Sequence, residues 1–161
     1  MTRTHHLRGI QNIPVSLDEA WQFFSNPHNL LTITPSFLNL KIPGELADEQ
    51  IYTGQVMKYT VKPFLGIPIS WTTEITHVEP LRFFIDEQRK GPYDLWHHEH
   101  YFKAIEGGVE MIDKVNYSLP WGVLGHMAHI IAVRKKLKQI FVCILLNPAF
   151  YLEQYTQKKT R

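Results

Sequence analysis

Polar and apolar side chains alternate along residues 95–105, and this alternation predicts a β-strand. Successive strand side chains point to opposite faces, so Trp96, His98, His100 and Phe102 share one face. Two imidazoles between two large aromatic rings would line either a protein core or a ligand pocket. This row is therefore the first candidate for a functional site.

A second strand follows after Gly107-Gly108, a pair that predicts a two-residue hairpin turn. With Glu106 paired to Val109, Asp113 lies opposite Phe102 and diagonal to His100. The second strand then adds four side chains to the same inner face: Met111, Asp113, Val115 and Tyr117. Asp113 is the one carboxylate of the two strands on this face, so it needs a partner or water.

The rest of the chain predicts more antiparallel strands between helical regions. A first strand is expected over residues 5–11, and the capping box Ser16-x-x-Glu19 predicts a short helix to Phe24. A second short helix is expected over residues 29–33, and further strands over residues 38–42, 51–61, 69–78 and 83–88. Helical periodicity from residue 124 to Asn147-Pro148 predicts one long amphipathic helix. Grouped strands indicate an α+β fold with a curved antiparallel sheet of about six to seven strands.

Composition excludes several classes of protein. A net charge of +2 among 161 residues, without a basic stripe, argues against nucleic-acid binding. The single cysteine, Cys143, and the lack of an apolar N-terminal signal segment predict a cytoplasmic location. No apolar run is long enough for a membrane span. The length predicts a single domain over residues 1–161, large enough to contain a cavity.

Several motifs occur together in an order typical of one superfamily. They are Ser16-x-x-Glu19, Gly91-Pro92-Tyr93-x-x-Trp96-x-His98-x-His100-x-Phe102, Asp113-x-Val115-x-Tyr117-x-Leu119-Pro120 and a long C-terminal helix. This chain resembles the START-related helix-grip (SRPBCC) superfamily, and within it the bacterial polyketide cyclase/dehydrase-like ligand-binding branch. The resemblance implies a sheet wrapped around the C-terminal helix and a cavity for a lipid, polyketide-like or aromatic ligand. It implies no universal catalytic triad.

The first functional hypothesis is therefore an apolar pocket with polar anchors, closed by the last helix. The ligand-binding candidates are Trp96, His98, His100, Phe102, Asp113, Tyr117 and Arg134. The alternative is an ordinary core in which Asp113 and Tyr117 satisfy the imidazoles. A compact interaction module would likewise have a filled interior.

Two chemical alternatives use the same residues. His100 and Asp113 are the catalytic candidates, because a carboxylate can orient an imidazole for acid/base catalysis in a cofactor-free cyclase or dehydratase. His98 and His100 can also present two nitrogens to one Zn²⁺, with Asp113 as third ligand. No third His or Cys completes this set in the sequence, so we expect neither a metal nor another cofactor.

Two features of the C-terminal region complete the predictions. Arg134 lies on the apolar stripe of the last helix. There it holds an anionic head group, extends outward to solvent or pairs with a buried acid such as Asp113. Residues 141–152, from Phe141 to Leu152, are more apolar than one buried helix face requires. We expect a homodimer contact there, with transient contact to a membrane surface as the alternative.

Overall fold

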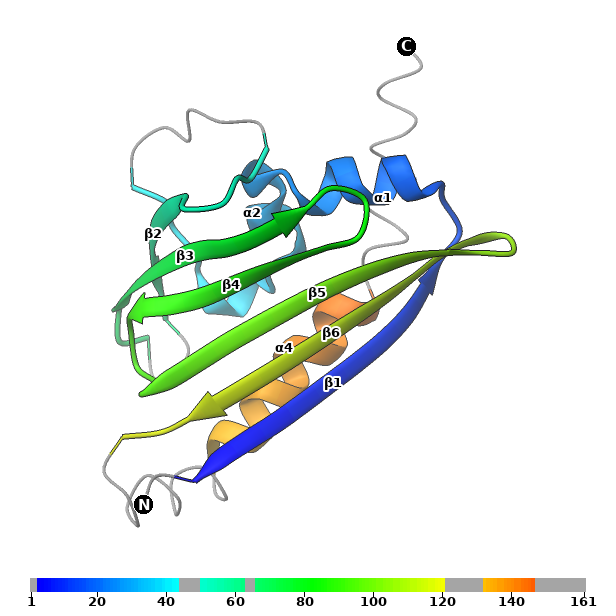
Figure 1. The fold of residues 1–161 in the computed structure, drawn as a ribbon. Helices are drawn as coiled ribbons and strands as arrows, with labels where there is room; N and C mark the ends of the chain where they lie inside the picture. The colour runs from blue at the N-terminus through cyan, green and yellow to red at the C-terminus, as the bar shows by residue number, and fades with distance from the viewer. Residues whose placement is uncertain (1–2, 44–49, 63–65, 121–131, 147–161) are drawn as a thin grey trace.

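In a computed structural model of the protein, the structure describes residues 3–43, 50–62, 66–120 and 132–146, the last four by their backbone alone. Strands and short helices come first, and a longer helix follows the last strand (Figure 1). The elements are β1 (Thr4–Ile13), α1 (Leu17–Phe24), η1 (Pro27–Asn29), α2 (Leu30–Ile33), η2 (Ser36–Leu38), β2 (Val56–Val61), β3 (Ile69–Glu79), β4 (Phe83–Lys90), β5 (Leu95–Ile105), β6 (Gly108–Ser118) and α4 (Arg134–Leu146). The α+β class and the two short helices after the first strand are confirmed.

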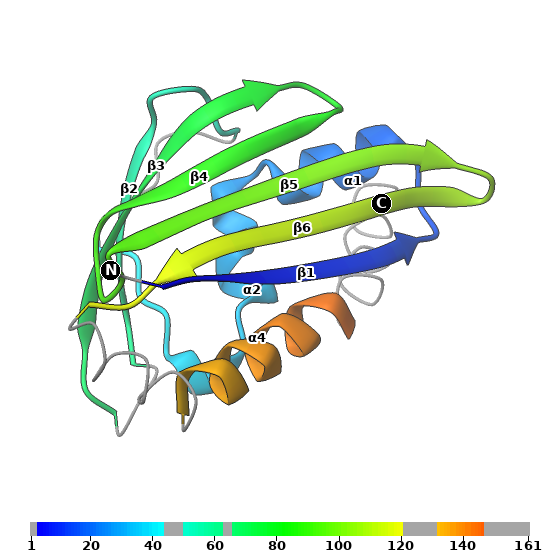
Figure 2. The same ribbon diagram turned by 60° about the horizontal axis from the view of Figure 1, so that its bottom comes forward.

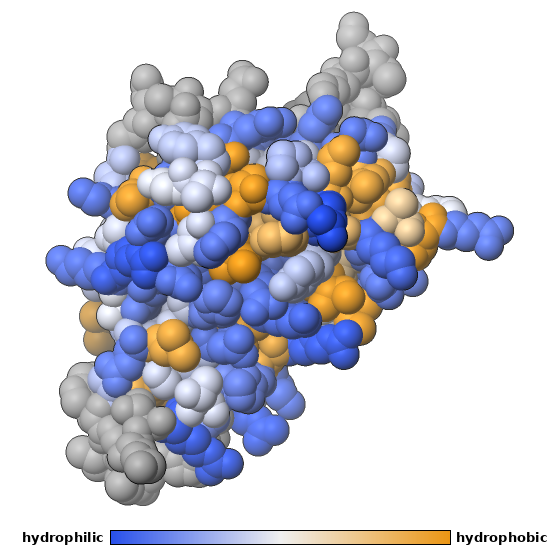
Figure 3. Space-filling view, viewed as in Figure 1, coloured by the Kyte–Doolittle hydropathy of each residue, from blue (hydrophilic) through white to orange (hydrophobic). Residues whose placement is uncertain are grey.

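The strands form one six-stranded antiparallel sheet in the order β1-β6-β5-β4-β3-β2. The sheet curves, and α1, α2 and α4 all lie on its concave side (Figures 1 and 2). The opposite, convex face carries mostly hydrophilic side chains (Figure 3). One side of the sheet is thus buried and the other meets water, as antiparallel sheets permit.

The first helix begins where the sequence predicts it. The Ser16 hydroxyl accepts a hydrogen bond from the Glu19 amide at 3.3 Å, and the Glu19 carboxylate accepts one from the Ser16 amide at 2.9 Å. This reciprocal capping satisfies two amide groups that the first turn leaves unpaired. The helix then buries Trp21 and Phe23 against the sheet.

Side chains of β6 alternate between the two faces as predicted. Five of them are buried on the concave side: Val109, Met111, Asp113, Val115 and Tyr117. Their neighbours on the convex side are only partly buried, except Ser118, which is buried. The hydrophobic pattern therefore determined correctly which face of this strand is inside.

The predicted register of the β5–β6 hairpin is wrong by two residues. Ile105 pairs with Gly108, so the turn is Glu106-Gly107 and His100 lies directly opposite Asp113. Gly107 takes the positive φ of +78° that the turn requires. Gly108 is instead a strand residue, and a Cβ there would lie 2.2 Å from the Ile13 carbonyl oxygen. Close approach of β1, which lies far away in sequence, explains the second glycine.

Two other predicted strands are corrected. Over residues 38–42 the chain leaves the helical turn η2 and makes only an isolated bridge between Lys41 and Thr60. The strand expected over residues 51–61 begins at Val56, because a turn precedes it in which Gly54 has a φ of +90°. Alternation alone did not reveal these turns.

The C-terminal helix is confirmed over Arg134–Leu146, and the predicted start near residue 124 lies outside the described residues. In Figure 2 it runs beneath β1 on the concave side. No helix among the described ranges is long and apolar enough to cross a membrane. The single domain and the cytoplasmic location stay predictions.

Candidate functional site

A cavity of about 290 Å³ lies between the sheet and the helices. Residues of two hydrophobic clusters line it, for example Ile75 and Phe84 from the cluster beneath α1, and Val133 and Leu137 from the cluster beside α4. Most of the remaining wall is also apolar or aromatic. Its size is near the lower end of the range of ligand pockets, about 300–1,000 Å³.

Aromatic rings form the wall around one end of β5. The Trp71 and Trp96 rings meet edge to face with centroids 5.3 Å apart, and Tyr93 packs against Trp96 at 4.8 Å. All three line the cavity. The indole Nε1 of Trp71 is buried and has no hydrogen-bond partner within the described part of the chain. An unpartnered N–H group at this place is unusual, because buried N–H groups generally have a hydrogen-bond partner.

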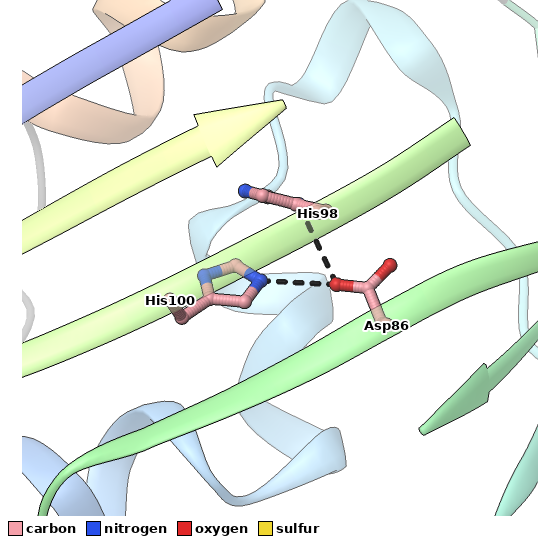
Figure 4. A group of neighbouring side chains, drawn as sticks. All are labelled: Asp86, His98 and His100. Atoms are coloured by element: carbon pink, nitrogen blue, oxygen red, sulfur yellow. Dashed lines mark hydrogen bonds and ion pairs between the residues drawn. The ribbon is translucent and has the colours of Figure 1, made fainter. Parts of the chain in front are cut away.

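Four polar side chains form a closed group on the same wall. Asp86 lies opposite His98, and Asp113 opposite His100, in the pairing of β4, β5 and β6. The Asp86 Oδ2 atom is 3.5 Å from His98 Nδ1 and 3.0 Å from His100 Nε2 (Figure 4). The Asp113 Oδ1 atom is 3.4 Å from His98 Nε2 and 2.7 Å from His100 Nδ1. Two imidazoles thus alternate with two carboxylates, and we call these residues the His–Asp cluster.

The contacts within the His–Asp cluster are not equivalent. His100 Nε2 makes a directed hydrogen bond to Asp86, which accepts it. His100 Nδ1 lies closer to Asp113, yet its orientation does not meet the geometry of a hydrogen bond, so this contact is an ion pair. The two imidazole rings are tilted by 43° with centroids 3.8 Å apart, and the Phe84 ring stacks on His100 with centroids 4.1 Å apart.

Burial and charge act in opposite directions on His100. Burial alone lowers the pKa of its imidazole, but the carboxylates of Asp113 and Asp86 outweigh burial and raise this pKa to about 9. Burial raises the pKa of Asp113, and the two imidazoles more than reverse this and hold it well below its usual range. At neutral pH the cluster therefore holds an imidazolium at His100 and a carboxylate at Asp113.

A second polar pair lies deeper in the cavity wall. The Tyr59 hydroxyl is 2.6 Å from the Thr73 hydroxyl, and both residues line the cavity. Burial, and then the charge of Asp86, raise the pKa of Tyr59 far above its ordinary value. Tyr59 is therefore neutral at physiological pH.

The structure brings four predicted site residues together at the cavity: Trp96, His98, His100 and Asp113. Phe102 and Tyr117 are buried but do not line it, which corrects their predicted placement. The Trp21 ring of α1 covers Phe102 with centroids 5.5 Å apart, and Tyr93 covers Tyr117 at 5.9 Å. Sharing a strand face is thus insufficient when other elements cover its ends.

Arg134 is not part of this site. Its side chain is exposed at the start of α4 and does not line the cavity. An exposed side chain fits the outward alternative, because a long cationic side chain can follow an apolar surface and keep its charge in water. The apolar stripe alone could not distinguish the two orientations.

The segment predicted as a dimer contact begins inside the site. Phe141 lines the cavity, with its ring 6.0 Å from that of His98, whereas Val142 is exposed. The rest of the predicted segment, residues 143–152, lies outside the described side chains. The homodimer and the membrane contact stay predictions.

Sequence reasoning missed Asp86 and gave Trp71 no functional role. Asp86 alternates with Phe84 along β4 and so shares its face, a signal available in the sequence. Its meeting with two histidines depends on the pairing of β4 with β5, which is a property of the folded sheet.

Comparisons with known proteins give structural matches only. No protein-family model matches the chain, and no curated protein matches its sequence. The TTHA0849 protein of Thermus thermophilus superposes with a TM-score of 0.71 and 14% identity, over 94% of this chain and 99% of that one. The Zhui aromatase/cyclase of Streptomyces gives 0.66 and 14%, over 99% and 97%. Ara h 8.0201 gives 0.57 and 16%, over 94% and 99%.

The chain has the helix-grip fold. The matched structures cover nearly all of it, which confirms the fold that the sequence motifs predicted. At these identities the likeness shows the fold alone, because proteins with one fold perform many functions. Function has to be argued from the cavity itself.

Proposed function

We propose that the protein reversibly binds a small hydrophobic molecule in its cavity, such as a compact lipid, a polyketide-like molecule or an aromatic compound. The observation that supports this best is an apolar cavity of about 290 Å³ with a buried polar cluster on one wall. The alternative, an ordinary close-packed core, would not leave a cavity of this size.

Apolar contact supplies the binding energy in this proposal. Removing about 200 Å² of apolar ligand surface from water is worth about 5 kcal/mol. Part of this is lost to the entropy of association, so we expect modest affinity. The Trp71 indole N–H and the His–Asp cluster then orient a polar substituent of the ligand.

A fluorescent apolar probe, 1-anilinonaphthalene-8-sulfonate, tests the proposal. We expect saturable binding to the native protein and at least tenfold weaker binding to Leu137→Trp, because Leu137 is buried on the cavity wall. Val142→Trp is the matched control on the same helix, since Val142 is 51% exposed and should bind the probe normally.

Val61→Phe fills the cavity from the opposite wall, where Val61 is buried on β2. Circular dichroism and thermal unfolding show whether each variant folds. If Leu137→Trp folds poorly, Val61→Phe still tests the cavity. Probe binding that is unchanged in both folded cavity variants would contradict the proposal.

A second candidate function is a cofactor-free cyclase or dehydratase; the structurally similar Zhui protein is named an aromatase/cyclase. The observation that favours it is the buried His100 between two carboxylates at the cavity wall. With a pKa of about 9, His100 is protonated at neutral pH and suits a general acid better than a base. We expect His100→Gln to abolish turnover of a reactive polyketide and retain probe binding. Equal turnover in the two proteins would remove the catalytic role.

A further inference from the structure

The His–Asp cluster places three potential ligand atoms around one point. Asp86, His98 and His100 each offer one ligand atom, and these three atoms lie within 4.8 Å of one another (Figure 4). A tetrahedral ion with bonds of about 2.0–2.2 Å separates its ligand atoms by roughly 3.3 Å. The carboxylate oxygen lies 3.5 and 3.0 Å from the two ring nitrogens, close to that spacing.

The types of donor atom also favour certain metal ions over others. Two imidazole nitrogens and one carboxylate oxygen suit Zn²⁺ and other divalent first-row transition ions. Mg²⁺ and Ca²⁺ prefer sites made of oxygen ligands. The three residues come from adjacent positions on two paired strands, so the backbone holds them rigidly.

Asp113 occupies the position of a supporting carboxylate. Its Oδ1 atom lies near the second nitrogen of both imidazoles, at 3.4 Å from His98 Nε2 and 2.7 Å from His100 Nδ1. Carboxylates behind metal-bound histidines fix the orientation of the ring. Asp113 is nearly fully buried, and a divalent cation bound at His100 Nε2 would replace the proton there and balance the charge of the two carboxylates.

We propose that Asp86, His98 and His100 bind one divalent first-row transition-metal ion, with Asp113 orienting both imidazoles. All four residues line the cavity, so the metal site would lie on the wall of the space where a ligand would bind. The site departs from the sequence expectation in two ways: a metal is bound, and Asp86 rather than Asp113 is the carboxylate ligand. The metal site does not depend on the proposed hydrophobic ligand, although both would use the His–Asp cluster.

Calorimetric titration with Zn²⁺ tests the site, on protein without a histidine tag that has been stripped with a chelator. We expect one equivalent to bind. Asp86→Asn and His98→Gln each remove a ligand and should weaken binding by more than the roughly 10–100-fold expected for Asp113→Asn, which removes only a supporting contact.

His97→Ala is the matched control, because the chain has nine histidines and surface imidazoles also bind zinc weakly. His97 is adjacent on β5 but contacts Glu87 and Glu99 on the other face, so this variant should bind Zn²⁺ as the native protein does. Co²⁺ gives a second readout, the visible absorption of a four- or five-coordinate ion, which Asp86→Asn should lose.

Three results would overturn the site: less than one equivalent bound to the native protein, native affinity in Asp86→Asn, or a larger loss in Asp113→Asn than in Asp86→Asn. Circular dichroism checks the fold of each variant, and the stoichiometry of the native protein decides even where a variant does not fold. The fluorescent probe should bind to metal-free protein whether or not the metal site exists. The zinc titration and the probe titration therefore test the two proposals separately.

Discussion

The two faces of β5 carry the same kinds of residue in opposite environments. On the convex face, His97 lies 2.9 Å from Glu87 and 3.2 Å from Glu99, and these side chains remain 18–30% exposed. On the concave face, His98 and His100 meet Asp86 and Asp113, with only 5–17% of each side chain exposed. Adjacent residues of one strand thus build two imidazole–carboxylate groups that differ mainly in burial.

Burial changes how much an imidazole–carboxylate group contributes to the stability of the fold. Ion pairs that remain partly in water typically add at most about 1 kcal/mol to stability. Moving charges away from water has a large cost, so a buried pair is weak evidence of a stabilising role. The convex group is explained as an ordinary solvated surface. The concave group occupies a cavity wall at a cost in desolvation, which is why we assign function to it.

The largest expected difference between the faces concerns loss of a carboxylate. Asp113→Ala leaves two buried imidazoles without one of their acceptors, and we expect it to lower the free energy of unfolding by about 3–5 kcal/mol. Glu87→Ala on the convex face should change it by less than about 1 kcal/mol. Urea unfolding measures both, and similar small losses would contradict the assigned difference in burial.

The pH dependence of stability sharpens the comparison next. Because the pKa of His100 is raised from 6.5 to about 9 in the folded protein, its stabilising contribution is complete below about pH 6.5 and lost as pH rises through 9. The expected loss is on the order of 3 kcal/mol. Thermal or urea unfolding between pH 6 and pH 10 measures it.

His100→Gln is the control for this pH profile, because it removes the titrating group and should flatten the fall between pH 6.5 and 9. At acid pH, Asp113 matters because its pKa is lowered in the folded protein. The ionised Asp113 therefore contributes stability above about pH 3.8, and this contribution is lost as the pH falls further. An unchanged alkaline slope in His100→Gln would show that another group causes it.

The smallest expected effect belongs to the convex histidine. His97→Ala removes a partly exposed contact to Glu87 and Glu99 and should change the free energy of unfolding by less than about 1 kcal/mol. Probe binding should be unchanged. A loss of several kcal/mol, measured by urea unfolding, would mean that burial does not separate the two faces.

Local pattern predicted much of this architecture. Alternation identified the inner faces of β5 and β6, and the capping box located α1 to the residue. These features depend on periods of two residues and on contacts three residues apart, which a sequence displays directly. The motif order then predicted the helix-grip fold, which the structural matches confirm.

Features that depend on long-range pairing were not predictable in this way. The predicted hairpin register was wrong because Gly108 is not a turn residue but a strand residue that allows close approach of β1. Asp86 was missed because its histidine partners lie on another strand. Phe102 and Tyr117 share the right face, yet neighbouring aromatic rings cover them. Which residues line a cavity is decided by what packs over them, and one sequence does not display that.

The central claim is that the concave wall of the sheet encloses a binding site. A crystal structure of the protein with 1-anilinonaphthalene-8-sulfonate tests it most directly. The account predicts the naphthalene rings against Trp71 and Trp96, with the sulfonate directed toward the indole N–H or the imidazolium of His100. A collapsed cavity, or a probe bound only on the outer surface, would contradict it.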